Sequence, residues 1–364
     1  MTDDTAVAAA ALAGLHAVGP ATLRRLLTAW PDPRAAVRAI QSGRAVDALA
    51  RRDREAVVRR WQRELDLVAT ETLLRARGTR VFRAREPSFP IDTGLADHPL
   101  VLFGEGLRPD ALERPRVGVV GTRAATPHGR ADAYELGGVL ARAGVTVVSG
   151  LAIGIDGSAH EGALDASGLA IGVLGTGLDI VYPRRHTSLH ERVREHGMLL
   201  SENAHGVGPH PSRFPIRNRI IAALSDVLVV VEATETGGAR ITAQKAYEYG
   251  VDVCAYPGSR RNPSARGTNE LLRTAHVILD PDDVLAVLGL NPGNRRSPAD
   301  LTGGAGEPGT LDEQALLQAL GGEPATVDEL TSRTALGPGP VAVAIAGLIR
   351  SGHLRRAHGV YWPR

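Results

Sequence analysis

Between Arg116 and Leu279, short apolar runs alternate with amphipathic stretches, and this alternation limits the folds that the chain can adopt. Strands that alternate with helix-length segments form βαβ units around a parallel sheet. We therefore expect an α/β fold with an extended Rossmann-like, doubly wound parallel sheet. The seven predicted strands cover residues 117–120, 145–149, 170–174, 198–201, 227–231, 251–255 and 277–279.

Two helical regions flank the predicted sheet domain, which covers residues 81–290. Residues 1–80 are rich in Ala, Leu and Arg at helical spacing and predict a small domain resembling a SAM or helix-hairpin-helix unit, with its turn at His16 to Pro20. DNA contact at this turn and ordinary bundle architecture both stay open. Residues 291–309 are rich in Gly and Pro and predict a linker.

Residues 310–364 have the order of a winged helix. The expected helices cover residues 311–320, 326–333 and 340–350, and a hairpin follows at 353–362. The third helix presents small apolar residues and one basic residue, Arg350, whereas a helix that reads a DNA groove usually carries Arg, Asn or Gln. A DNA-binding role and a protein-contact role therefore both stay open.

Composition excludes several classes of protein. The 42 basic and 40 acidic residues leave a net charge of only +2, so a polyanion partner has to be argued from local clusters. The single cysteine, Cys254, excludes an intramolecular disulfide framework and a multi-thiolate metal site. Asp3 and Asp4 stand where a signal peptide is basic, and no apolar stretch reaches about 18 residues. We expect a cytoplasmic protein without membrane contact, metal or cofactor.

The chemistry of such a sheet is expected at the carboxyl ends of its strands, where an open α/β sheet binds ligands. The first strand runs into Gly121-Thr122-Arg123. There the glycine permits a tight turn, the threonine can hold a phosphate oxygen, and the arginine adds a charged fork. The second strand ends in Ser149-Gly150, and Asp156 with His160 follows, which we interpret as structural. Neither a dinucleotide fingerprint nor a P-loop accompanies these loops.

The most informative stretch is residues 213–221. Pro215 is placed to begin a helix, with Arg217 and Asn218 in its first turn. Arginine there opposes the helix dipole unless an anion is bound. Between Arg184 and Arg219 there are seven Arg and three Glu. Several cationic loops along one groove suit the repeating phosphates of single-stranded nucleic acid, and Phe214 either stacks on a base or packs the helix entrance.

Ordered motifs from about residue 84 to 290 resemble the bacterial DNA-processing protein A family, DprA or Smf. The motifs are residues 119–123, 149–156, 159–160, 177–179, 182–183, 200–202, 214–221, 237–242 and 256–258. Two departures concern loop geometry. Residues 237–242 are Gly-Gly-Ala-Arg-Ile-Thr, where the family usually has Ser-Gly-Ser-Leu-Ile-Thr. His186 stands where the family commonly has Asn.

The resemblance implies a non-enzymatic mediator that binds and protects incoming single-stranded DNA in natural transformation and loads the recombinase RecA onto it. It also implies a homodimer with its surface at about residues 243–279. By motif, the expected phosphate ligands are Arg123, Arg184, Arg217, Asn218 and Arg219. The remaining DNA-binding residues that we predict are Gly121, Thr122, Ser149, Gly150, Phe214, Thr242 and Lys245.

A nucleotide-processing enzyme on the same fold is the alternative. The sequence resembles phosphoribohydrolases in its sheet and phosphate-binding loops, but those enzymes need a Pro-Gly-Gly-x-Gly-Thr-x-x-Glu loop. Here Pro257-Gly258 is followed by Ser259-Arg260-Arg261, without that Glu. We therefore expect no catalytic residues.

Overall fold

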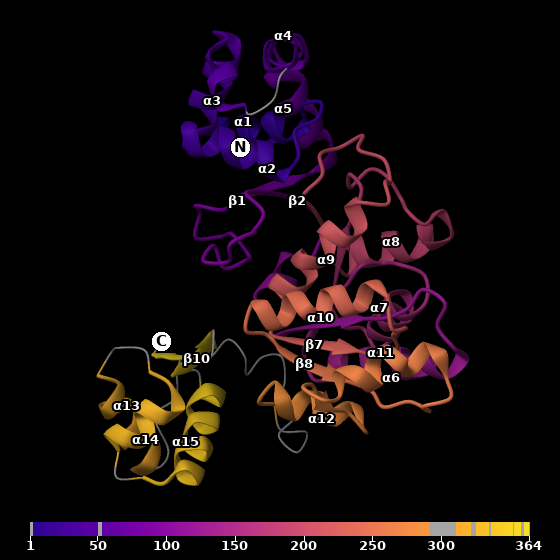
Figure 1. The fold of residues 1–364 in the computed structure, drawn as a ribbon, viewed down its shortest axis with the longest axis vertical. Coiled ribbons are helices and arrows are strands. Elements are labelled where there is room, and N and C mark those ends of the chain that lie inside the picture. The colour runs from indigo at the N-terminus through magenta and orange to yellow at the C-terminus, as the bar shows by residue number, and fades with distance from the viewer. Residues whose placement is uncertain are drawn as a thin grey trace.

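The computed structural model describes residues 3–49, 53–290, 311–321, 325–334, 336–351, 353–357 and 360–363. Figure 1 shows the amino-terminal helices at one end, the sheet with its covering helices in the middle and a small carboxyl-terminal unit. The expected linker at 291–309 lies outside the described residues. None of the helices in these ranges combines the length and the apolarity that crossing a bilayer requires.

The central sheet contains all seven predicted strands. From β3 it extends through β4, β5 and β6 on one side and through β7, β8 and β9 on the other, and these seven strands are parallel. Their bounds are β3 (Arg116–Val120), β4 (Thr146–Ser149), β5 (Ala170–Leu174), β6 (Gly197–Ser201), β7 (Val227–Val230), β8 (Asp252–Ala255) and β9 (His276–Val277).

Two further strands make the sheet larger than expected. β2 (Val101–Glu105) pairs antiparallel with β6, and β1 (Arg80–Arg83) pairs antiparallel with β2 at the edge. Every residue of β2 is buried. The parallel sheet predicted from the sequence therefore carries an antiparallel extension at the end that faces the amino-terminal helices (Figure 1).

Side chains that alternate along each strand pack into two hydrophobic cores, one on each face of the sheet. Val117, Val119 and Val147 pack with one set of helices, whereas Val120 and Val148 point to the opposite face and pack with another. This alternation is the two-residue period of a strand that is buried on both faces. The first face is covered by α6 (Pro127–Arg142), α7 (Ile155–Asp165) and α12 (Pro281–Val287), and the second by α9 (Arg213–Leu224) and α10 (Gly238–Glu248).

The shorter elements complete the sheet domain. α8 (Thr187–Glu195) packs beside β6 through Leu189 and Val193, and α11 (Arg266–Leu271) follows β8. The 3-10 turns are η2 (Pro109–Leu112), η3 (Arg184–His186) and η4 (Pro263–Ala265).

The amino-terminal region forms the expected short helices and shares its core with the sheet. Leu12, Leu26 and Trp61 belong to the same buried cluster as Phe103 of β2 and Leu199 of β6. The elements are α1 (Asp4–Gly14), α2 (Pro20–Ala29), α3 (Pro33–Gln41), η1 (Arg44–Ala48), α4 (Arg54–Glu64) and α5 (Leu67–Arg77). The turn between α1 and α2 is bound internally, because the His16 N–H donates to the Glu64 carboxylate at 3.0 Å.

The carboxyl-terminal unit is a winged helix, as predicted. It consists of α13 (Leu311–Leu320), α14 (Val327–Arg333), α15 (Pro338–Arg350) and the hairpin β10 (Leu354–Ala357) with β11 (Val360–Pro363). Thr326 and Glu329 form a capping box that satisfies the first amides of α14. Leu316, Leu330, Val341 and Tyr361 build a separate small core.

Candidate nucleic-acid interface

The loop after β3 is fixed by the loop after β7. The Thr122 N–H donates to the Glu232 carbonyl at 2.7 Å, and the Thr126 N–H donates to the Glu232 carboxylate at 2.8 Å. Thr126 also caps α6 by accepting from the Gly129 N–H. These strands lie on either side of the point where the strand order reverses, which is where doubly wound sheets bind ligands. Arg123 extends from this fixed loop as an exposed side chain.

Arg123, Phe214 and Tyr182 form one surface cluster. The guanidinium carbon of Arg123 lies 5.0 Å from the centroid of the Phe214 ring, and the Tyr182 ring centroid lies 5.2 Å from it at an interplanar angle of 31°. Arg123 and Tyr182 are exposed and Phe214 is half-buried. A Cβ at Gly175 would come within 2.9 Å of the Phe214 ring, so glycine there makes room for it. We call these three residues the Arg123 cluster.

Two more cations follow Tyr182 in the chain. Arg184 and Arg185 begin η3 and are exposed. The ring of His186 anchors this turn, because its Nδ1 lies 3.0 Å from the Leu151 carbonyl oxygen. Within the described ranges neither arginine forms an ion pair with a carboxylate. Both guanidinium groups are therefore accessible to an anion beside the Arg123 cluster.

The structure does not support the expectation that Arg217 contacts phosphate directly. α9 begins at Arg213, not at Pro215, so Arg217 lies in the second turn and the predicted conflict with the helix dipole does not arise. Arg217 is buried, and its Nη1 donates to the carbonyls of Gly150, at 2.7 Å, and of Val173. Arg217 is a positioning residue that joins α9 to the ends of β4 and β5.

Arg217 and Asp156 hold the Gly150 peptide between them. The Gly150 N–H donates to the Asp156 carboxylate at 3.1 Å, while the Gly150 carbonyl accepts from Arg217. Burial raises the pKa of the Asp156 carboxyl, although the Arg217 charge opposes this shift. Burial also lowers the pKa of Arg217 to about 10. A Cβ at residue 150 would come within 2.2 Å of the Arg217 guanidinium, so this position requires glycine.

Arg219 and Lys245 are also engaged internally. Arg219 is buried and lies 2.5 Å from the carboxylate of Glu202. The Lys245 ammonium lies 3.0 Å from Asp97 and 2.8 Å from Glu248. The unpaired positive charge between Arg184 and Arg219 is therefore smaller than the number of arginines suggests. Neither cation has the unpaired charge that a phosphate ligand needs in this structure.

The remaining predicted residues shape the loops. Ser149 and Thr242 are buried, and their hydroxyls donate to the carbonyls of Val119, at 2.5 Å, and Gly238, at 3.3 Å. The Asn218 amide donates to the same Gly238 carbonyl at 3.4 Å, beside the start of α10. At Gly121, a Cβ would come within 2.4 Å of Ile155, so glycine allows α7 to approach β3.

Comparisons with known proteins identify the family of this chain. A family model described as DNA recombination-mediator protein A matches residues 80–289. The chain belongs to this family. A second model, the DprA winged helix domain, matches residues 300–359.

Relatives of this family show how far the similarity extends. Protein Smf of Synechocystis is 43% identical over 179 residues, which are 49% of this chain and 45% of that protein. The putative DNA processing protein DprA of Mycobacterium tuberculosis is 38% identical over 243 residues, 63% of this chain and 62% of that protein. The matched segments thus span less than two thirds of these curated relatives.

Two solved family structures share the fold. DNA processing protein A from Streptococcus pneumoniae aligns with a TM-score of 0.66 and 30% identity, covering 78% of this chain and 97% of that one. DNA processing protein A from Helicobacter pylori aligns with a TM-score of 0.52 and 29% identity, covering 58% of this chain and 95% of that one. Its structure is described as giving insight into a single-stranded DNA binding mode.

His160 and His190 are buried, which agrees with the structural interpretation of His160. His160 is buried against the Ile171 carbonyl, with its Nε2 at 3.2 Å from that oxygen, and burial lowers its pKa to about 3. Burial lowers the pKa of His190 to about 4.

Burial also raises the pKa of the Cys254 thiol to about 12. In the parts of the chain described above, no cluster of three or more His, Cys, Asp or Glu residues could hold a metal ion.

Tyr182 and Arg185 are absent from the site residues predicted by sequence. In the sequence analysis Tyr182 is part of a family motif and is not a predicted ligand. Its contact with Phe214 joins residues that are 32 positions apart in the chain, so the sequence alone does not reveal it. An aromatic residue and two nearby arginines shortly after a strand-end loop are the signal that identifies this part of the site. We therefore add both residues to the candidate interface.

Proposed function

We propose that this chain binds single-stranded DNA along the carboxyl edge of its sheet. The observation that carries the proposal is the Arg123 cluster, in which an exposed cation and two aromatic rings lie on one surface with Arg184 and Arg185 next to it. Proteins that bind single strands combine cationic grooves for the backbone with aromatic rings on which bases stack. The binding mode described for the Helicobacter pylori relative supports the same ligand.

Within this proposal the predicted residues divide into two groups. Arg123, Arg184 and Arg185 would contact phosphates, and Phe214 with Tyr182 would stack on bases. Arg217, Arg219, Asn218 and Lys245 would act indirectly, because their polar groups already hold the loops and helices together.

We propose that the chain acts by binding and not by catalysis. The acidic side chain between the two strand-end loops, Glu232, is buried and accepts hydrogen bonds from the Thr126 N–H and, at 3.3 Å, from the Asn262 amide. A carboxylate held in this way serves as a structural group. This arrangement favours a DNA binder over the phosphoribohydrolase alternative.

We further propose that the protein protects DNA in natural transformation and loads RecA as a homodimer. Exposed apolar residues support the dimer: Ile241 and Tyr247 on α10, and Val277 and Leu279 at the edge strand β9, with an exposed fraction of 79% at Leu279. An unpaired edge strand beside apolar side chains is a ready surface for a second copy. Tyr247, Val277 and Leu279 fall within the expected range of residues 243–279, and Ile241 lies just before it.

A titration of labelled oligothymidylate tests the proposed function. The protein should bind the single strand more tightly than a duplex of the same length, with affinity that falls as salt rises. A parallel assay should show faster RecA assembly on the single strand when the protein is present. Equal affinity for both DNA forms would refute the first step, and unchanged RecA assembly would refute only the second.

A further inference from the structure

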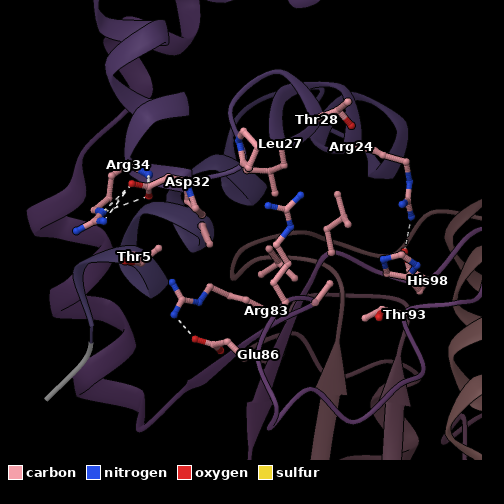
Figure 2. A pocket seen from close by; sticks show the side chains of 17 residues that line it. Thr5, Arg24, Leu27, Thr28, Asp32, Arg34, Arg83, Glu86, Thr93 and His98 are labelled. Atoms are coloured by element: carbon pink, nitrogen blue, oxygen red, sulfur yellow. Dashed lines mark hydrogen bonds and ion pairs between the residues drawn. The ribbon is translucent and has the colours of Figure 1, made fainter.

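A cavity lies between the amino-terminal helices and the antiparallel end of the sheet (Figure 2). It has a volume of about 650 Å³ and is lined by α1, α2, the turn into α3, and the segment from β1 to β2. Sites for small organic ligands typically measure about 300–1,000 Å³. None of its lining residues belongs to the Arg123 cluster.

Positive charge exceeds negative charge in the lining. Arg24, Arg34, Arg83 and Arg85 line the cavity, against the carboxylates of Asp32 and Glu86. Figure 2 shows Arg34 paired with Asp32 on one rim and Arg83 directed at Glu86. Arg83 also contacts Asp3 at 2.8 Å.

Arg24 and Arg85 lack such partners. Arg24 donates to the His98 carbonyl at 2.5 Å, an interaction that does not neutralise its charge (Figure 2). Burial raises the pKa of Glu202, and the Arg24 charge opposes part of this rise, but that carboxylate is already bonded to Arg219. Arg85 is exposed, and among the described residues it forms no ion pair. Two guanidinium groups at this cavity are therefore uncompensated.

Arg83 has an unsatisfied donor. Its Nε is buried and has no hydrogen-bond partner, even though the other end of the guanidinium contacts two carboxylates. A buried N–H without an acceptor costs free energy, but protein atoms cover this Nε, so Arg83 contributes charge to the cavity and no accessible donor.

The rest of the lining is apolar with scattered hydroxyl groups. Leu27, Leu100 and Val101 offer apolar surface, and Thr5, Thr28 and Thr93 offer hydroxyls. A ligand that suits both parts has a phosphate at one end, an apolar ring and a hydroxylated body. Guanidinium forks bind carboxylate and phosphate oxygens in pairs, and a phosphate has a third oxygen and a larger charge with which it can contact a second fork.

We propose that this cavity binds a nucleoside phosphate. Arg24 and Arg85 hold the phosphate, and the base lies against Leu27 and Leu100. The same chemistry is present in a free nucleotide and in the 5′-phosphorylated end of a DNA strand. The site is separate from the proposed DNA interface, so the two proposals can fail independently.

Calorimetric titration of the full chain with ADP tests the site, with inorganic pyrophosphate as the probe for anion binding alone. We expect one ADP per chain, weaker binding of pyrophosphate, and a decrease in affinity of about tenfold in Arg24→Gln and in Arg85→Gln. Arg25→Gln is the matched control, because Arg25 is adjacent to Arg24 in the chain and lies outside the cavity. Arg123→Ala should also leave ADP affinity unchanged.

Arg85→Gln keeps the test decisive if Arg24→Gln disturbs folding, because the exposed Arg85 side chain is not part of a core. Absence of ADP binding, wild-type affinity in both cavity variants, or a decrease only in Arg123→Ala would overturn the proposal. Equal binding of pyrophosphate and ADP would also overturn it, since the site would then recognise an anion alone. In the Arg123→Ala protein, displacement of ADP by a 5′-phosphorylated oligothymidylate but not by its unphosphorylated form would identify the strand end as the source; displacement by neither would identify the free nucleotide.

Discussion

Arg123 lies over the ring of Phe214, with its guanidinium carbon 5.0 Å from the ring centroid, although 91 positions separate the two residues. This interaction joins the loop after β3 to the first turn of α9. It places a cation and an aromatic face on the same surface, where one nucleotide can meet both. Substitutions at this surface and at the residues that support it should therefore have separable effects on DNA binding and on stability.

Phe214→Ala should weaken binding of oligothymidylate by about 1–3 kcal/mol, the usual contribution of stacking one base on an aromatic ring. Ile216→Ala is the matched control, because Ile216 is an exposed apolar residue of the same helix. Fluorescence anisotropy at fixed salt measures both. Equal effects in the two variants would mean that Phe214 only packs the helix entrance.

Arg123→Ala and Arg184→Ala should each flatten the dependence of log affinity on log salt by about 0.7 for every phosphate that the variant no longer neutralises. Arg142→Ala is the control, since Arg142 lies at the far end of α6, away from the carboxyl edge of the strands. The slope is measured by titrating DNA at several salt concentrations. An unchanged slope in both site variants would remove them from the interface.

Arg217→Ala should destabilise the protein by about 3–5 kcal/mol, because it leaves the buried Asp156 carboxylate without its countercharge and two carbonyls without their donor. Urea unfolding measures this decrease, and Arg123→Ala, at an exposed position, should cost little. If Arg217→Ala kept its stability but bound DNA more weakly, Arg217 would have to be a direct ligand.

The contribution of two buried histidines to stability should fall as the pH drops below about 6.5. The folded-state pKa values of about 3 for His160 and about 4 for His190 lie below the ordinary value of 6.5, so the unfolded chain binds these protons first. Each histidine contributes stability that is complete above pH 6.5 and decreases by about 1.4 kcal/mol per pH unit down to its folded pKa.

Raised pKa values of the Asp156 and Glu202 carboxyls act with the opposite sign, at pH values above their ordinary pKa values of 3.8 and 4.5. Comparison of the wild type with His190→Gln therefore isolates the histidine contribution. Between about pH 6.5 and 5, urea unfolding should show a weaker dependence of stability on pH in the variant. An identical dependence in both proteins would show that His190 is not held neutral in the fold.

Leu279→Asp should convert a dimer into a folded monomer, because Leu279 is mostly exposed in the single chain and its replacement costs the monomer little. Sedimentation velocity measures the mass. Val68→Asp, at an exposed apolar position on α5, is the matched control and should remain dimeric. A wild-type protein that sediments as a monomer at micromolar concentration would contradict the homodimer.

The parallel strands are predictable from the sequence because each is a buried apolar run between helix-length segments. β5 matches its predicted range of 170–174 at both ends, since glycines at 168 and 175 bound the run. The same pattern does not reveal β1 and β2, because they precede the alternating region and pair antiparallel. Their placement depends on the amino-terminal helices that pack against them.

The role of Arg217 cannot be predicted from sequence pattern. Its acceptors are main-chain carbonyls 67 and 44 positions away. Every residue has a main-chain carbonyl, so the residue types do not show which carbonyls accept from Arg217. The prediction that Pro215 begins the helix is wrong because a proline is tolerated anywhere in the first turn, where the amides have no intrahelical acceptor. α9 therefore begins two residues earlier, at Arg213.

Leu12 and Trp61 pack with Phe103 and Leu199 in one cluster, so the amino-terminal helices have no separate interior. Removal of the amino-terminal helices would expose apolar surface of β2 and β6 to solvent. The first helices therefore cover one end of the sheet and form a single packed body with it.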